Sequence, residues 1–169
     1  MARQQRRGSD QHEAQLATIY AAVTEPAPLA DRRQLKRFIN EYYKNIAAED
    51  VDEHSAGVHG AAALAHLRHG RQRADGEHCL RLYNPDADRD GWTSDRTVVE
   101  LVHENMPFLV DSLGMTLDRL GYAVQLTVHP LIRIERTAKG RLRRIHTRAD
   151  QPGNIESFIR MEIPRETRP

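Results

Sequence analysis

A change in the spacing of hydrophobic residues marks the middle of the chain. Residues 97–103 form a β-branched, apolar run that is typical of one buried strand. From Phe108 onward apolar residues recur at helical spacing, and Pro107 suits the first turn of that helix, where a missing N–H is tolerated. Gly121 stands where helices often end in a left-handed residue. Residues 122–134 then alternate with a period of two, so we predict a β-α-β unit.

The first third of the chain predicts helices. Apolar residues recur three and four positions apart in residues 16–23 and again in residues 35–46, and Asp31 is a suitable N-cap for the second of these helices. A third, alanine-rich helix is expected over residues 51–70, with Ser55 as a cap near its start. Because alanine side chains are small, this helix is expected to pack closely against its neighbour.

Aromatic and histidine side chains in these helices are interpreted as structural. Tyr42 falls on the buried stripe of its helix, and Tyr43 is expected to be half exposed, so core packing is favoured over base stacking. His59, His66 and His69 lie on the third helix without a cysteine or carboxylate at metal-ligand spacing. We therefore expect surface histidines and no metal site.

Three further segments are typical of strands: residues 77–83, 141–148 and 155–163. With the central unit they predict an α+β fold, in which N-terminal helices precede a β-α-β-β antiparallel sheet. Such a sheet needs a second helix over the face that the first helix leaves bare, and nothing after residue 163 supplies one. Either the N-terminal helices cover that face, or the sheet is truncated before its second helix and last strand.

Along the chain we expect four parts. They are a disordered leader over residues 1–10, a helical segment over residues 11–72, an α/β domain over residues 77–164, and a linker or chain end over residues 165–169. With 169 residues in all, the chain is long enough for one core of ordinary size.

Composition excludes several classes of function. The formal net charge is +1, so no overall field would recruit nucleic acid or an anionic membrane. No stretch approaches about 18 uncharged apolar residues, so no membrane span is predicted. The single Cys79 has no partner for an internal disulfide, which favours a reducing compartment and a cytoplasmic location.

An acidic segment, residues 84–91, has the alternating aspartates of a calcium loop. Thr97 stands where that loop requires an acidic residue, and Arg89 puts a positive charge among the ligands. We interpret the segment as a solvated turn, with Trp92 folded back on the sheet as its anchor.

A basic segment, residues 133–148, contains seven Lys or Arg and one acid. Its candidate basic patch consists of Arg141, Arg143 and Arg144. The patch could meet an anionic ligand or an acidic partner, but a flexible, solvated hairpin is the favoured interpretation. It also lacks the interleaved aromatic residues that nucleic-acid surfaces carry.

Residues 97–112, from Thr97 to Ser112, resemble the N-terminal region of the large bacterial NAD-specific glutamate dehydrogenases. Other segments fit the same region in the same order: residues 38–43, 61–66, 81–85, 91–92, 128–130 and 156–159. The resemblance covers roughly residues 30 to 164. It implies the first of several ACT-type regulatory domains, with a ferredoxin-like fold, and a dehydrogenase core far downstream.

The ACT resemblance also implies where a small amino acid would bind, namely the loop between the first strand of the unit and its helix. A helix N-terminus offers N–H groups and partial positive charge to a carboxylate there. The candidate effector or interface residues are Asn105, Met106, Pro107, Phe108 and Asp111. Phe108 replaces a glycine of the family pattern, and Pro107 removes a donor, so packing or oligomerisation is an equal alternative.

No catalytic arrangement is recognised in the sequence. Gly114 and Gly121 are isolated and do not form the glycine-rich turn of a dinucleotide site. His103, Asp111 and Ser112 lie close in sequence but lack the context of a hydrolase triad. We therefore expect no catalytic residue, no cofactor and no metal in this chain, with NAD belonging to the parent enzyme.

Three hypotheses follow. The first is a non-catalytic regulatory and assembly domain of a large NAD-dependent glutamate dehydrogenase, whose partners are the rest of that polypeptide, further copies in a homo-oligomer, and a small amino acid effector. The second is a stand-alone ACT domain that senses a small amino acid. The third, least favoured, is a nucleic-acid-binding module acting through the basic hairpin; neither nucleic acid nor membrane is an expected partner.

Overall fold

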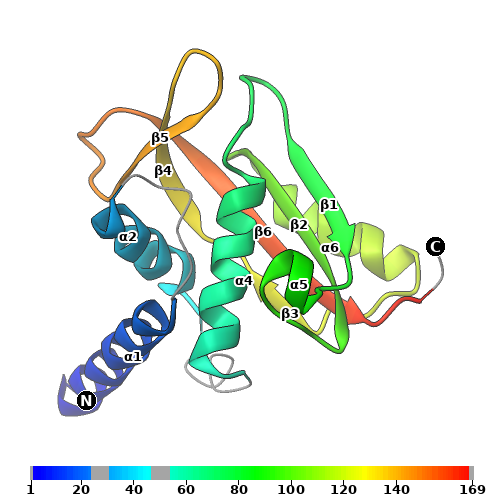
Figure 1. Ribbon diagram of the computed structural model, residues 1–169, viewed down its shortest axis with the longest axis horizontal. Helices are drawn as coiled ribbons and strands as arrows, with labels where there is room; N and C mark the ends of the chain where they lie inside the picture. The colour runs from blue at the N-terminus through cyan, green and yellow to red at the C-terminus, as the bar shows by residue number, and fades with distance from the viewer. Residues whose placement is uncertain (1, 24–30, 47–53, 168–169) are drawn as a thin grey trace.

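The fold is an antiparallel sheet between two layers of helices (Figure 1). The structure, a computed structural model, describes residues 2–23, 31–46 and 54–167, and their side chains from residue 11 onward. Within these ranges, one face of the sheet carries α1 (Ala2–Ala22), α2 (Arg32–Tyr43) and α4 (Ala56–His69), and the other face carries α6 (Leu109–Arg119). This arrangement confirms the predicted α+β class.

The last strand of the chain lies at the centre of the sheet. The strands are β1 (Cys79–Tyr83), β2 (Arg96–Glu104), β3 (Leu126–Val128), β4 (Leu131–Arg136), β5 (Leu142–His146) and β6 (Asn154–Pro164). Their order is β1-β2-β6-β4-β5, with β3 also paired to β6, and every pairing is antiparallel. Because β2 and β3 both run antiparallel to β6, they are parallel to each other, and the predicted β-α-β unit is split by β6.

Residues 122–134 form two strands rather than the single strand that their period-two pattern predicted. Pro130 lies between β3 and β4, where its missing N–H removes no ladder hydrogen bond. Its carbonyl still accepts a hydrogen bond from the N–H of Phe158 at 3.1 Å, which holds the break against β6. Tyr122 packs in the cluster under α6, whereas Leu126 belongs to the core on the opposite face.

One hydrophobic cluster joins the N-terminal helices to the sheet. It combines residues of α1, α2 and α4 with buried residues of β2 to β6, and the rings of Phe38 and Phe158 meet edge to face with centroids 5.5 Å apart. A smaller cluster lies between α6 and the other face. The N-terminal helices therefore cover the face that α6 leaves bare, which is the first of the two alternatives. The division into a helical segment and an α/β domain stays a prediction, although both contribute to this one core.

Three predicted helix ends are confirmed. The side chain of Asp31 accepts a hydrogen bond from the N–H two residues later, and that of Ser55 from the N–H three residues later. Gly121 has φ of 85°, directly after the C-cap of α6.

The first helix begins earlier than expected. The backbone of residues 2–10 is part of α1, in the stretch where a disordered leader was predicted. Alanine, arginine and glutamine dominate this stretch and are good helix formers. At the other predicted start, residues 51–53 of the third helix lie outside the described residues, and α4 begins at Ala56.

The predicted exposure of several residues on α2 and α4 is wrong. Tyr43 is fully buried, and its hydroxyl donates to the carbonyl of His59 at 2.8 Å. His59 and His66 are also buried, and His66 Nδ1 lies 2.8 Å from the hydroxyl of Tyr42. Only His69 keeps partial exposure. Because the alanines of α4 let it lie deep against its neighbours, polar side chains on several of its faces become buried.

Charged side chains lie buried beneath α4 as well. Glu100, Arg160 and Glu162 occupy the α4 face of the sheet and are at most 1% exposed. Arg81 Nη2 lies 2.7 Å from Glu100, and Arg96 Nη1 lies 3.3 Å from Glu162. The space between α4 and the sheet is therefore partly ionic, which no apolar periodicity predicts.

The acidic segment before β2 contains a short helix, α5 (Ala87–Asp90), rather than only a turn. The side chain of Asp86 caps it by accepting hydrogen bonds from two N–H groups. Trp92 is 4% exposed and packs with Ala62, Ala65 and Val98, as its predicted anchoring role requires.

Candidate functional site

The turn between β2 and α6, residues 105–108, carries most of the predicted effector or interface residues. The N–H of Asn105 donates to the carbonyl of Ile155 on β6 at 2.9 Å, which ties the turn to the central strand. Pro107 precedes the helix, and Phe108 occupies its N-cap without a side-chain hydrogen bond to the first turn. The cap of α6 therefore supplies no side-chain acceptor, and Asp111 is the acidic side chain in the first turn, where it interacts favourably with the partial positive charge of the helix start.

Phe108 has the left-handed backbone conformation that glycine usually supplies. Its φ is 64° and its ψ is 9°, and no other non-glycine residue in the described ranges has a positive φ. This conformation costs about 1–2 kcal/mol for an L-residue. Since the side chain is 77% exposed, packing does not compensate. The turn has the backbone conformation that glycine favours, but Phe108 adds an exposed ring where a glycine would leave the backbone open.

Three polar side chains meet behind the turn. Ser157 Oγ lies 3.2 Å from Asn105 Oδ1 and 3.3 Å from His129 Nε2. Burial lowers the pKa of His129, while the negative charge of Asp111 acts in the opposite direction. Asp111 therefore lies close enough to His129 to influence it. Sequence reasoning selected Asn105 and Asp111 but missed His129 and Ser157, because their meeting depends on the pairing of distant strands.

Exposed hydrophobic side chains lie in the turn and beside it. They are Met106, Phe108, Leu131 and Ile155, with exposures between 40% and 77%. Leu131 pairs with Ser157 on β6, so it lies on the α6 face of the sheet, beside the turn.

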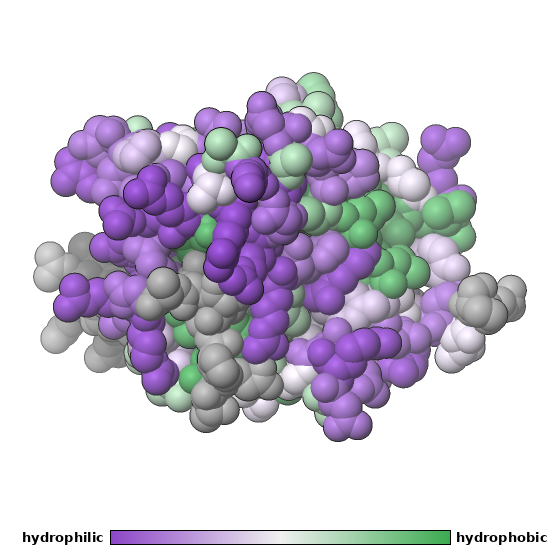
Figure 2. Space-filling view, turned by 45° about the horizontal axis from the view of Figure 1, so that its top comes forward, coloured by the Kyte–Doolittle hydropathy of each residue, from purple (hydrophilic) through white to green (hydrophobic). Residues whose placement is uncertain are grey.

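The edge strand β1 exposes two more leucines on that face. Leu80 pairs with Leu101 and Leu82 pairs with Val99, and both partners pack against α6. Leu80 is 54% exposed and Leu82 is 59% exposed. Figure 2 shows hydrophobic residues gathered toward the right of the view, whereas most of the remaining surface in that view is hydrophilic.

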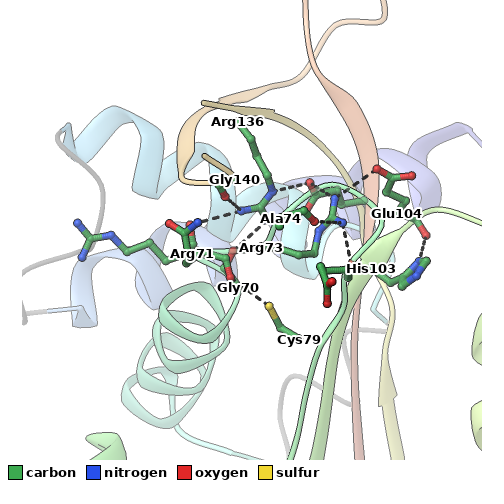
Figure 3. Close-up of polar contacts among 12 residues, drawn as sticks. Gly70, Arg71, Arg73, Ala74, Cys79, His103, Glu104, Arg136 and Gly140 are labelled. Atoms are coloured by element: carbon green, nitrogen blue, oxygen red, sulfur yellow. Dashed lines mark hydrogen bonds and ion pairs between the residues drawn. The ribbon is translucent and has the colours of Figure 1, made fainter. Parts of the chain in front are cut away.

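A second polar centre joins the segment after α4 to the β4–β5 hairpin (Figure 3). Glu156 accepts hydrogen bonds from Arg73 at 2.9 Å and from Nε and Nη2 of Arg136 at 2.7 Å each. The side chains of Arg73 and Glu156 are 2% and 1% exposed. Burial opposes the charge of Arg73, but its hydrogen bond and ion pair with Glu156 outweigh burial and raise its pKa.

This centre corrects the prediction of a flexible hairpin. Arg136 donates to the carbonyls of Gly70 and Gly140 at 2.9 Å each, and the N–H of Arg73 donates to Gly140 at 3.1 Å. A cavity of about 420 Å³ lies beside it, and its lining carries Asp75 and Glu135 as well as the two arginines. Since both arginines of the lining are engaged by Glu156 and by backbone carbonyls, the arrangement is suited to fixing the hairpin.

The predicted basic patch is not gathered into one surface. Arg141, Arg143 and Arg144 are all exposed, but Arg143 and Arg144 are consecutive on β5 and point to opposite faces. Arg143 also forms an ion pair with Glu135 at 3.0 Å. Arg143 and Arg144 therefore lie on different sides of β5, and a binding role for the patch stays a prediction.

The described ranges contain no group of three side chains that could hold a metal ion. They also contain no helix that is long and apolar enough to cross a membrane. Two of the α4 histidines, His59 and His66, take part in ring and hydrogen-bond contacts within the helical layer.

Comparisons with known proteins give a consistent result. A family model described as "Glutamate dehydrogenase, ACT1 domain" matches residues 38–169. The chain is 40% identical over 88 residues to an NAD-specific glutamate dehydrogenase of Pseudomonas aeruginosa, covering 51% of this chain and 5% of that protein. It is 31% identical over 140 residues to the NAD-specific glutamate dehydrogenase of Halomonas elongata, covering 80% of this chain and 9% of that protein.

A third relative is the NAD-specific glutamate dehydrogenase of Mycobacterium tuberculosis, 36% identical over 86 residues, or 51% of this chain and 5% of that protein. No solved structure matches the chain. The matched stretch is thus a small part of each relative's length.

Proposed function

This chain belongs to the glutamate dehydrogenase ACT1 domain family, and we propose that it acts as a non-catalytic regulatory and assembly domain of an NAD-dependent glutamate dehydrogenase. The parent reaction would be the oxidative deamination of L-glutamate to 2-oxoglutarate and ammonia, with NAD bound elsewhere in the polypeptide. The single observation that carries this proposal is the family match over residues 38–169. A cytoplasmic location is part of the same proposal and is supported by the single Cys79.

The apolar α6 face supports an assembly role. Leu80 and Leu82 on the edge strand, with Met106 and Phe108 at the turn, expose large hydrophobic side chains on that side of the sheet. Contiguous exposed apolar surface commonly marks an interaction site. The relatives are more than ten times longer than the matched stretch, so we propose that a following part of the same polypeptide covers this face. Association of copies into a homo-oligomer is a separate part of the same proposal, through surfaces outside this face.

Deletion in the full-length dehydrogenase tests the proposal. An enzyme that lacks residues 1–169 is expected to keep NAD binding and turnover while its oligomeric mass or its response to effectors changes. Mass photometry and initial-rate kinetics measure both. Unchanged mass together with an unchanged effector response would contradict the proposal, and so would glutamate turnover by the 169-residue chain alone.

Point variants test separately whether the exposed leucines of β1 lie in such an interface. In the full-length enzyme, Leu80→Ser with Leu82→Ser is expected to expose β1 to faster limited proteolysis and deuterium exchange. Ala138→Ser is the control, since Ala138 is exposed in the β4–β5 turn at the opposite edge of the sheet from β1. If β1 is equally protected in both variants, Leu80 and Leu82 do not belong to the interface.

Small-amino-acid sensing at the turn is the second candidate function. The uncapped start of α6 and the polar contacts of Asn105 with Ser157 favour it, because a carboxylate and an ammonium group would each find partners. The ring of Phe108 opposes close approach to the backbone. Isothermal titration with small amino acids tests it, and Phe108→Gly is expected to strengthen any binding; absence of heat in both proteins would rule this function out.

A further inference from the structure

Two histidines lie side by side where the edge strand β1 begins. Cys79 pairs with Val102 at this end of the β1–β2 ladder, so the same register places His78 opposite His103. Their ring centroids lie 6.4 Å apart, with an angle of 30° between the ring planes. We propose that this pair binds a divalent transition-metal ion such as Zn²⁺, with water in the remaining coordination positions.

Both imidazoles project from the α6 face of the sheet. Leu101 packs in the cluster under α6, and its partner Leu80 is exposed on the same face. Because side chains alternate along a strand, His103 and His78 share the face of these two leucines. His78 is exposed and His103 is half-buried, so an ion reaches both rings from solvent. The site lies beside the apolar α6 face but does not depend on the function proposed for that face.

A hydrogen bond prepares the ring of His103 as a ligand. Its Nδ1 lies 2.8 Å from the carbonyl oxygen of Glu104 (Figure 3). Because a carbonyl oxygen can only accept, Nδ1 carries the proton, and the neutral ring has its lone pair on Nε2. Metal-binding histidines almost always donate their other ring N–H to a carbonyl, carboxylate or water in this way, which fixes the ring orientation.

No other polar group competes for these lone pairs in the part of the chain that the structure describes. There the ring of His78 makes no hydrogen bond or ion pair, and Nδ1 is the one ring nitrogen of His103 that has a partner. By contrast, His129 and His146 each have a ring nitrogen within hydrogen-bond distance of another side chain. The pair on β1 and β2 therefore retains a lone pair on each ring for an ion.

The spacing of the rings suits one shared ion. With metal–nitrogen bonds of about 2.1 Å, two imidazoles on a tetrahedral ion have ring centroids about 5 Å apart. The rings would approach each other by about 1 Å, which a small rotation of the exposed His78 side chain provides. Imidazole nitrogen suits Zn²⁺, Ni²⁺ and Cu²⁺, whereas Mg²⁺ and Ca²⁺ prefer oxygen ligands. A bound ion would link the edge strand to its neighbour.

Isothermal titration of the 169-residue chain with Zn²⁺, in metal-free buffer at pH 7, tests the proposal. We expect saturable binding, tighter binding of Cu²⁺, and no binding of Mg²⁺. Zn²⁺ should also raise the thermal unfolding temperature, because an ion held between two paired strands binds the folded chain in preference to the unfolded one.

The chain contains nine histidines, so variants are needed to locate the ion. His78→Gln and His103→Gln are each expected to weaken Zn²⁺ binding at least about tenfold, since loss of a mere outer-shell partner already costs that much, and to abolish the rise in unfolding temperature. His12→Gln is the matched control, because His12 is a partly exposed histidine of α1, on the other side of the sheet, and it should keep both responses.

Far-UV circular dichroism verifies that each variant folds. Loss of binding in both His78→Gln and His103→Gln, with binding kept in His12→Gln, would support the site. Absence of saturable binding, a loss in only one of the two variants, or an equal loss in His12→Gln would each overturn the proposal.

Discussion

The guanidinium of Arg136 and the carboxylate of Glu156 form two parallel hydrogen bonds of 2.7 Å each. This two-point contact fixes the geometry of both groups, and it places the β4–β5 hairpin against β6. Arg73 approaches the same carboxylate from the segment after α4. The buried carboxylate of Glu156 is therefore paired with two guanidinium groups from distant parts of the chain.

Glu156→Gln is expected to destabilise the protein by about 3–5 kcal/mol, because two largely buried guanidinium groups would lose their shared counter-charge. Urea unfolding at pH 7 measures the loss. Asp150→Asn is the matched control, since Asp150 and its partner Arg148 are 65% and 72% exposed, and a change within about 0.5 kcal/mol is expected. Equal effects of the two substitutions would show that the Glu156 contact is not a buried ion pair in solution.

Gly140→Ala is expected to lower stability by about 3 kcal/mol, because an added Cβ would overlap the backbone carbonyl of Arg73. Gly140 also has a φ of 80°, which disfavours alanine by itself. Gly76→Ala separates the two effects, since Gly76 has a φ of 71° but no atom near its Cβ position. That variant should lose only about 1 kcal/mol. Thermal unfolding compares them, and similar losses would exclude close contact between the hairpin and Arg73.

Phe108→Gly is expected to stabilise the protein by about 1 kcal/mol, because glycine adopts the left-handed conformation without the steric cost that Phe108 bears. Phe108→Ala keeps a Cβ and is the matched control, with little change expected. Differential scanning calorimetry of both variants measures the difference. A destabilised Phe108→Gly would mean that the exposed ring makes contacts that outweigh its backbone strain.

Stability is expected to fall as the pH drops from about 6.5 toward 4. The pKa of His69 is lowered to about 4 by burial, so between these values the unfolded chain binds a proton that the folded chain excludes. Burial lowers the pKa of His66 in the same direction. His69→Gln should make urea midpoints less dependent on pH in this window, whereas His78→Gln, at an exposed position, should not. An unchanged pH dependence in His69→Gln would contradict the lowered pKa.

Hydrophobic periodicity predicted the elements of this fold well. The helix around Leu113 and Leu117, its strands on either side and the caps at Asp31 and Ser55 follow from local spacing and local hydrogen bonds, which the sequence displays directly. The apolar residues before and after Pro130 keep the same period of two. The pattern alone therefore predicted one strand where the structure has two.

Burial of polar side chains was beyond the reach of the same reasoning. His66 and Glu100 are polar residues whose burial depends on partners that are distant in sequence, Tyr42 for the first and Arg81 for the second. The same holds at the turn, where Asn105 was selected by its place before a helix, but Ser157 joins it only through the pairing of β2 with β6. Contacts of this kind depend on which strands pair with each other, and the spacing of hydrophobic residues along the chain does not specify that pairing.

The position of β6 has a consequence for how the protein is made. The strand that joins β2, β3 and β4 is the last of the six to leave the ribosome, so before it emerges the earlier strands can pair only as β1 with β2 and β4 with β5. Until β6 pairs with them, the apolar side chains of the earlier strands stay exposed on the nascent chain. In the folded sheet α6 covers one face of these strands and the N-terminal helices cover the other. Ribosome-bound chains that end before residue 154 should therefore engage chaperones, and release should coincide with the emergence of residue 164.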